Sequence, residues 1–247
     1  MGEFLSALEE VRKILSEKTV ISRGTEESNY LLVEDYIPGS EVAVEGMLIN
    51  GDFKLLTIFD KPDPLEGPYF TETIYVTPSR LPAQQQEEIV ETTKAVCRSL
   101  GLSSGPVHAE LRLNEKGAWI IEIAARSIGG LCSRALRFTG NISLEEIILR
   151  HSLGMDISRI EREEAAAGVM MMPVPKSGIL KKVSGINNAK NVPGVEDIVV
   201  TTAPQQEIAP LPFGNRYLGF IFARGDSSEF VEGSIREAFV KIKIEME

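Results

Sequence analysis

Apolar and polar residues alternate strictly on both sides of a short turn in the middle of the chain. A period of two predicts half-buried strands, and the sequence Asn-Glu-Lys-Gly at 114–117 is typical of the turn between them. The pattern therefore predicts a β-hairpin whose polar face places Glu110 and Glu122 opposite each other. The apolar positions are Val107, Ala109, Leu111 and Leu113 before the turn and Trp119, Ile121, Ile123 and Ala125 after it.

Before this hairpin the chain alternates between helical and strand patterns. Helical spacing of apolar residues covers 3–17 and 82–100. A loop at 60–72 is too rich in proline for regular structure. Strands are expected near 30–36, at 41–49 and 53–59 around an Asn50-Gly51 turn, and at 74–77.

After the hairpin the chain turns at Gly129-Gly130 and enters a helix at about 143–153, for which Ser143 is the expected N-cap. The charged and then alanine-rich run at 159–167 predicts a domain boundary, so residues 1–165 and 166–247 are expected to form two domains. The second domain is expected to be a small α+β unit. Its pattern predicts strands near 197–201 and 216–223 and a helix near 227–241, with the methionines at 170–172 as core residues.

Composition and charge exclude several classes of protein. With 247 residues and 43% hydrophobic content, the chain can bury the core of one large or two modest domains. The net charge of −10 argues against binding to nucleic acid or to anionic membranes. The sequence contains no apolar run of about 18 residues, and its N-terminus has helical spacing with interspersed charge, so the expected location is the cytoplasm. The two cysteines, Cys97 and Cys132, predict neither a disulfide framework nor a zinc site.

The two facing glutamates indicate a metal site. Like charges opposite each other destabilise a β-ladder, and a divalent cation between them would reverse that effect. Mg²⁺ is usually held by one or two carboxylates together with nucleotide phosphates. Arg126 follows on the same face and would point at those phosphates. The alternative is a solvated hairpin whose acids are screened by Arg112 and Arg126.

Three segments together resemble the ATP-grasp superfamily and, more narrowly, its L-amino acid ligase and carnosine-synthase-like branch. The resemblance covers most of residues 1–165 and implies an α+β fold, namely the C-terminal lobe of the ATP-grasp fold with an antiparallel sheet and flanking helices. Residues 166–247 are similar to the C-terminal domain of such ligases. The three segments are VEDYIPGSE at 33–41, DKPDP at 60–64 with its continuation to Pro78-Ser79, and HAE at 108–110 with EIAARSIGG at 122–130.

The resemblance implies a site for ATP and for Mg²⁺ or Mn²⁺. Glu41 would bind the ribose hydroxyls, Glu110 and Glu122 would hold the metal, and Arg126 would act on the transferring phosphoryl group. Many relatives carry an asparagine two residues after the second glutamate, where this chain has Ala124. The adenine would lie on a hinge formed by Glu34, Asp35, Tyr36 and Ile37.

The resemblance also implies an amino acid pocket. Lys61 and Glu72 would line it, with Tyr75 at the position where related ligases have histidine. The turn at Gly129 and Gly130 would allow close approach of the substrate, although glycine pairs also mark ordinary turns. The alternative for Lys61 is a surface lysine paired with Asp60 or Asp63. His108 is expected to be a structural partner of Glu110.

The implied function is ATP-dependent ligation of a carboxylate to an amine through an acyl phosphate. The segment that would carry a phosphate-binding lysine and a glycine-rich loop has no counterpart before Glu34. The chain is therefore expected to be the C-terminal part of a ligase, with the first lobe supplied in cis or in trans and a possible homodimer. One alternative is a non-catalytic nucleotide-binding or partner module of a split enzyme. Another is a different ATP-grasp chemistry, such as carboxylation or ligation in purine synthesis.

Overall fold

The computed structural model describes residues 2–16, 30–65 and 69–247. The helices are α1 (Gly2–Leu15), α3 (Ala83–Ser99), the 3-10 helix η2 (Cys132–Ala135), α4 (Leu144–Ser152), α5 (Ile186–Lys190) and α6 (Ser228–Val240). The strands are β1 (Ser40–Ile49), β2 (Asp52–Asp60), β3 (Ile74–Thr77), β4 (Gly105–Asn114), β5 (Gly117–Ala124), β6 (Ala166–Met172), β7 (Gly178–Ser184), β8 (Val195–Val200), β9 (Glu207–Ile208), β10 (Gly219–Gly225) and β11 (Lys243–Met246).

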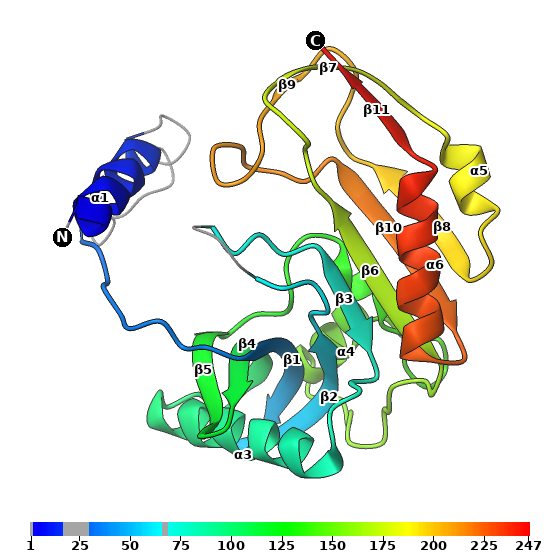
Figure 1. Cartoon of the computed structure of the whole chain (residues 1–247). Helices are drawn as coiled ribbons and strands as arrows, with labels where there is room; N and C mark the ends of the chain where they lie inside the picture. The colour runs from blue at the N-terminus through cyan, green and yellow to red at the C-terminus, as the bar shows by residue number, and fades with distance from the viewer. Residues whose placement is uncertain (1, 17–29, 66–68) are drawn as a thin grey trace.

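One antiparallel sheet of eight strands runs through most of the molecule, in the order β5-β4-β1-β2-β3-β6-β10-β8 (Figure 1). Its two halves meet where β3 pairs with β6, so that Ile74 lies opposite Met170. A separate sheet of three strands has the order β11-β7-β9. The predicted α+β class with an antiparallel sheet and flanking helices is confirmed. The predicted division at residue 165 stays a prediction.

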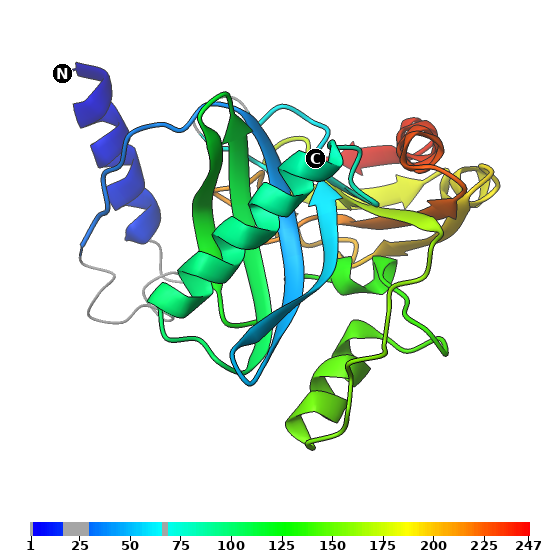
Figure 2. The ribbon, with the colours of Figure 1, turned by 90° about the horizontal axis from the view of Figure 1, so that it is seen from below.

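The half of the sheet that contains β1, β2, β4 and β5 has one apolar and one polar face. Helix α3 lies across the apolar face (Figure 2), where Ile89 packs among Val42, Val44 and Leu111. Because side chains alternate along a strand, the residues between these apolar positions point to the other face. Across β1 and β4 these are Glu41 opposite Arg112, Ala43 opposite Glu110 and Glu45 opposite His108.

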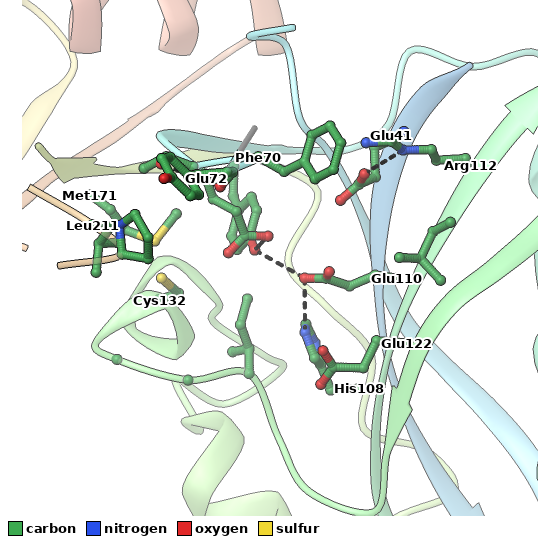
Figure 3. Close-up of a pocket in the computed structure, with 18 of the residues that line it drawn as sticks. Glu41, Phe70, Glu72, His108, Glu110, Arg112, Glu122, Cys132, Met171 and Leu211 are labelled. Carbon is green, nitrogen blue, oxygen red and sulfur yellow. Dashed lines mark hydrogen bonds and ion pairs between the residues drawn. The ribbon is translucent and has the colours of Figure 1, made fainter. Parts of the chain in front are cut away.

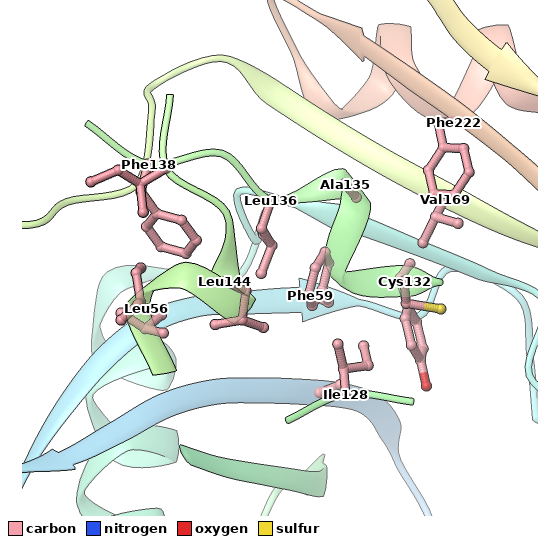
Figure 4. Close-up of a cluster of buried hydrophobic side chains, with 14 of the residues drawn as sticks. Leu56, Phe59, Ile128, Cys132, Ala135, Leu136, Phe138, Leu144, Val169 and Phe222 are labelled. Carbon is pink, nitrogen blue, oxygen red and sulfur yellow. The ribbon is translucent and has the colours of Figure 1, made fainter. Parts of the chain in front are cut away.

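The polar face is closed at its base by a hydrophobic cluster that joins both halves of the sheet (Figure 4). Phe59 of β2 contributes to it from one half and Val169 of β6 from the other. Side chains from η2, α4 and the adjoining loops belong to the same cluster, including Cys132, Leu136, Phe138 and Leu144. The segment from 128 to 160 therefore supports the floor of the polar face.

Helix α6 packs so closely on β6 that only glycine fits at position 168. A β-carbon there would lie 2.8 Å from Cγ1 of Val231 and 2.9 Å from the carbonyl oxygen of Tyr75. Gly168→Ala is expected to destabilise the chain by about 1–3 kcal/mol through overpacking. Gly233→Ala, at a helical position with no atom within 4 Å of the added carbon, is expected to stabilise it by about 0.5–1 kcal/mol. Denaturant unfolding of both variants measures these two opposite changes in the free energy of unfolding. A Gly168→Ala chain as stable as the parent chain would contradict the close packing.

Two sequence predictions are wrong. The expected strand near 30–36 is absent, because this segment makes no ladder contact with the described residues and exposes Tyr30, Leu32 and Val33. On β5, the expected inward positions Trp119 and Ile121 are exposed. The cause is a register shift that pairs Leu111 with Ile120 and Glu110 with Glu122, which leaves Ile121 as an extra residue.

The remaining predicted elements lie within a few residues of the observed ones, and α1 ends at Leu15. The predicted end of that helix at residue 17 and part of the loop at 60–72 fall outside the described residues. Within the described part of the chain, every helix is too short or too polar to cross a bilayer.

Candidate functional site

A cavity of about 960 Å³ opens on the polar face of the sheet, at the upper end of the range of roughly 300–1,000 Å³ for small-molecule sites. It brings together most of the residues predicted from the sequence (Figure 3). Lys61 does not line it but lies directly behind its carboxylates. The predicted residues that line the cavity are Glu34, Asp35, Tyr36, Ile37, Glu41, Glu72, Glu110, Glu122, Arg126, Gly129 and Gly130.

Arg112 organises the end of the cavity that is lined by residues 34–37. Its Nε donates to Oε2 of Glu41 at 2.8 Å, and its Nη1 donates to the carbonyl oxygen of Ile37 at 2.9 Å. The guanidinium also lies 4.9 Å from the ring centres of both Tyr36 and Phe70. Arg112 therefore fixes the segment at 34–37 to β1 and β4, which the sequence analysis did not foresee.

Lys61 is buried among three carboxylates and is not a surface lysine. Its side chain is 3% exposed, and its Nζ lies 2.8 Å from Glu41 and 2.9 Å from Glu110, with Glu72 also in contact. Burial alone would lower the pKa of Lys61, but Glu72, Glu110 and Glu41 together raise it. The ammonium therefore stays charged, and the alternative pairing with Asp60 or Asp63 is wrong.

Glu72 and Tyr75 lie beside this cluster. The hydroxyl of Tyr75 donates to Oε1 of Glu72 at 2.5 Å, and Lys61 reaches the same oxygen. Burial raises the pKa of Glu72, against the opposing attraction of Lys61. The tyrosine thus takes up part of the bonding capacity of Glu72 at the position where the family resemblance led us to expect histidine.

The hairpin register is as predicted, with Glu110 directly opposite Glu122. The alternative of a solvated hairpin fails for Glu110, which is largely buried in the cavity, while Glu122 is 56% exposed and lies 3.4 Å from Arg126. Burial would raise the pKa of Glu110, but His108 and Lys61 hold it well below its usual range. These two partners therefore favour the ionised form of Glu110.

These two carboxylates fit a hard divalent cation. The described contacts of Glu110 with Lys61, His108 and Tyr75 all use Oε1, which leaves Oε2 for a ligand shared with Glu122. Oxygen donors of this kind suit Mg²⁺. A second group of carboxylates, Glu41, Glu72 and Glu110, has oxygens within 4.8 Å of one another, but the ammonium of Lys61 already lies among them.

His108 connects this site to the loop that follows the hairpin. Its Nε2 lies 3.5 Å from Oε1 of Glu110, as predicted, and its Nδ1 bonds to buried Glu45. The other oxygen of Glu45 accepts the backbone N–H of Ile128 at 3.1 Å. Glu45 therefore holds both the imidazole and the segment after Arg126, and the sequence analysis missed it because it read as one more residue of an alternating strand.

Stability in metal-free buffer is expected to fall as the pH rises through about 9. Burial alone would lower the pKa of His108, but its bonds to Glu110 and Glu45 raise it from 6.5 to about 9. Such a histidine contributes stability that is fully present below its unfolded pKa and is lost above its folded pKa. Urea unfolding between pH 6 and 10 measures the slope. His108→Gln should flatten this dependence of stability on pH, whereas the control His151→Gln should leave it as in the parent chain. If the slope in His108→Gln equalled that in His151→Gln, the assignment would be contradicted.

The glycine turn passes close to the C-terminal half of the sheet. Gly130 has a φ of +62°, and a β-carbon there would lie 3.3 Å from the ring of Phe220. At Gly129 the same addition meets no atom of the described residues within 4 Å. The turn therefore needs glycine at 130 for its conformation, while position 129 faces open space.

The loop that carries Lys61 and Glu72 is fastened to α6 by ion pairs. Arg80 bridges the start of the loop to Glu232 through contacts of 2.8 Å each, and Arg236 bridges the same glutamate to a second acid of the loop at 2.9 and 2.5 Å. Helix α6 therefore helps to position the loop. The two acids of the loop are Asp60 and Asp63.

The C-terminal half of the sheet also supplies one end of the cavity, which the sequence analysis missed. Hydrophobic residues in this half read as ordinary core positions, and their place at the cavity follows only from the pairing of β3 with β6. The lining residues from this half are Met171, Leu211, Pro212, Tyr217 and Phe220.

Models of two protein families match the chain. A model of the ATP-grasp domain matches residues 1–135, which is more than half of the chain, and a model of the L-amino acid ligase C-terminal domain 2 matches residues 170–247. The crystal structure of an L-amino acid ligase from Bacillus licheniformis superimposes with a TM-score of 0.75 and 29% identity, covering 86% of this chain and 53% of that one.

Curated relatives match over shorter segments. Carnosine synthase 1 of Gallus gallus is 35% identical over 106 residues, which are 43% of this chain and 11% of that protein. Alanine--anticapsin ligase of Bacillus subtilis (strain 168) is 36% identical over 89 residues, which are 36% of this chain and 18% of that protein. The chain thus spans a small part of these two relatives and about half of the solved ligase. It belongs to the ATP-grasp family, and its C-terminal part is similar to the C-terminal domain of L-amino acid ligases.

Proposed function

We propose that this chain carries the metal- and nucleotide-binding part of an ATP-dependent ligase that joins a carboxylate to an amine, with an amino acid among its substrates. The observation that carries this proposal is the placement of Glu110, Glu122 and Arg126 in one cavity with the hinge at 34–37. Family membership supports it. The related proteins named above are ligases and synthases, although each is longer than the part matched here.

In the proposed site the nucleotide lies along the cavity from the hinge to the hairpin. Residues 34–37 hold the adenine, and Glu41 accepts the ribose hydroxyls after exchanging its bond to Arg112 or Lys61. Glu110 and Glu122 hold Mg²⁺ or Mn²⁺, which neutralises charge on the transferring phosphoryl group when bound. Ala124 offers no side-chain ligand, so water or phosphate oxygens complete the coordination.

The proposed chemistry has two steps. A substrate carboxylate takes the γ-phosphoryl group of ATP to give an acyl phosphate and ADP, and an amine then displaces inorganic phosphate to form the amide. Arg126 is the proposed catalytic residue, because a guanidinium can stabilise negative charge on the transferring group and then on the acyl phosphate. Lys61, Glu72, Gly129 and Gly130 are the proposed substrate-side residues. Such a transfer depends mainly on positioning and charge.

Calorimetric titration of the chain with ATP tests the binding part of the proposal. Binding of ATP in the presence of Mg²⁺ and its loss on chelation with EDTA are expected. If ATP binds neither with Mg²⁺ nor with EDTA, while circular dichroism shows that the chain is folded, the proposed nucleotide site is wrong.

We also propose that a first grasp lobe with a phosphate-binding lysine acts together with this chain, in cis or in trans. The exposed apolar side chains of α1 and of the segment at 30–36, including Phe4, Leu5, Leu32 and Val33, support a further contact surface there. The mass of the native polypeptide in its source cell distinguishes the two arrangements. A band near 27.1 kDa places the lobe on another chain, and a band larger by one domain places it on the same one. Cytoplasmic location and a homodimer remain predictions.

A further inference from the structure

The cavity has two chemically different ends (Figure 3). Glu41 and Arg112 lie at one end, Glu72 and Glu110 lie between, and Met171, Leu211 and Cys132 lie at the other. The lining residues between positions 34 and 126 include six acids, two arginines and a histidine, whereas every lining residue from position 128 onward is uncharged. The lining therefore changes from charged to uncharged after Arg126, and the C-terminal half of the sheet contributes only uncharged residues to it.

The uncharged end is also buried. Cys132, Met171 and Phe220 expose 2%, 4% and 7% of their surfaces, and the rings of Tyr217 and Phe220 meet edge to face at 6.5 Å. Burial raises the pKa of Cys132 to about 12 and raises the pKa of Tyr217 as well. Thiol and phenol are thus both neutral. A charged group placed at this end would lose its hydration, and none of the described residues that line this end carries a charge to pair with it.

The proposed function leaves this end for the substrate that is not ATP. If the nucleotide extends from the hinge to the carboxylates of the hairpin, its γ-phosphate lies in the middle of the cavity, next to Glu72. The described contacts of Glu72 with Lys61 and Tyr75 both use Oε1, and its carboxylate also interacts with Glu110; a substrate ammonium would meet Glu72 through Oε2. An amino acid whose ammonium meets Glu72 and whose carboxylate meets the phosphate then has only the apolar end for its side chain.

We propose that Cys132, Met171, Leu211, Tyr217 and Phe220 form the side-chain pocket for the amino acid substrate and that this pocket selects a large apolar side chain. This inference rests on the proposed function and names the substrate class for the same site. Because each buried methylene changes affinity about 10-fold or more in a tight apolar pocket, leucine, methionine and phenylalanine should be preferred over alanine. Aspartate and lysine should be excluded, since the charged end of either side chain would lose its hydration among uncharged lining residues.

The test is calorimetric titration of the full chain, saturated with Mg·ADP, with L-leucine, L-methionine, L-phenylalanine, L-alanine, L-aspartate and L-lysine. We expect at least one of the large apolar amino acids to bind 10-fold or more tightly than alanine, and aspartate and lysine not to bind. The inference would be overturned if aspartate or lysine bound as tightly as the large apolar amino acids. It would also be overturned if the chain bound Mg·ADP but then bound none of the six amino acids. Failure of Mg·ADP itself to bind would instead refute the proposed function.

A charge-bearing variant checks the location of the pocket. Leu211→Lys, on a loop at the edge of the proposed pocket, should weaken binding of the preferred apolar amino acid at least 10-fold and permit binding of aspartate. Leu153→Lys, at an exposed position of the segment after α4, should leave both unchanged. Leu211→Ala serves if the lysine variant does not fold, because the smaller side chain should weaken binding of the apolar amino acid without admitting aspartate. Unchanged selectivity in a folded Leu211 variant would place the pocket elsewhere.

Discussion

Replacing Lys61 with methionine is expected to lower the free energy of unfolding by about 3–5 kcal/mol, the loss typical of removing one partner from a buried charge pair. The ammonium lies among Glu41, Glu72 and Glu110, whose carboxylate oxygens come within 4.8 Å of one another. Without it, three partly or fully buried acids would face each other with too little positive charge to compensate them. Urea unfolding at pH 7 in metal-free buffer measures this loss.

Two comparisons separate this effect from the loss of any lysine. Lys94→Met removes a lysine that pairs with Glu91 on the exposed face of α3, and such pairs contribute about 0–1 kcal/mol. Adding Glu72→Gln to the Lys61→Met chain should recover part of the lost stability, because it removes one of the repelling charges. A Lys61→Met chain as stable as the Lys94→Met chain would contradict the assigned role of the ammonium.

Replacing Glu122 with glutamine is expected to weaken Mg²⁺-dependent binding of ATP by at least about 10-fold, since even outer partners of metal ligands have effects of that size. Glutamine preserves the size of the side chain and removes the charge that would hold the cation. The melting temperature should not change, because Glu122 is 56% exposed and its described ion pair is a 3.4 Å contact with Arg126. Calorimetric titration with ATP, with and without Mg²⁺, measures the effect.

The matched control is Glu115→Gln in the turn of the same hairpin, where the side chain is exposed and does not line the cavity. It changes the net charge of the chain by the same amount and should leave binding of Mg·ATP unaffected. In EDTA both variants should behave as the parent chain does. If Glu122→Gln bound Mg·ATP as tightly as Glu115→Gln, Glu122 would not be a metal ligand.

The hairpin could be predicted from the sequence because its information is local. Alternation and a four-residue turn were enough to place Glu110 opposite Glu122. The same alternation failed at Ile121, where a register shift inserts one residue, because a bulge leaves the apolar and polar residue types in place and changes only which way they point. Alternation also failed at 30–36. A strand needs a neighbouring strand to pair with, and the pattern of apolar and polar residues does not show whether one is present.

The environments of Lys61 and Glu45 could not be predicted because they depend on contacts between distant segments. The three acids around Lys61 come from three separate segments: Glu41 from β1, Glu72 from the loop that precedes β3, and Glu110 from β4. The sequence alone left both a site role and a surface role open for Lys61. Glu45 lies opposite His108 only because β1 pairs with β4. The apolar end of the cavity depends in turn on the pairing of β3 with β6, which joins two segments that the sequence analysis treated as separate domains.

The most direct test of the proposed ligase function is a product assay with the polypeptide isolated from its source cell. The assay supplies Mg·ATP with and without the panel of amino acids and measures ADP, inorganic phosphate and amide by mass spectrometry. A ligase that acts through an acyl phosphate should form the three products in equal amounts, only when an amino acid is present, and Glu122→Gln should abolish them. ADP release that is independent of amino acids, or a site saturated with Mg·ATP that forms no amide with any of them, would contradict the proposed ligation.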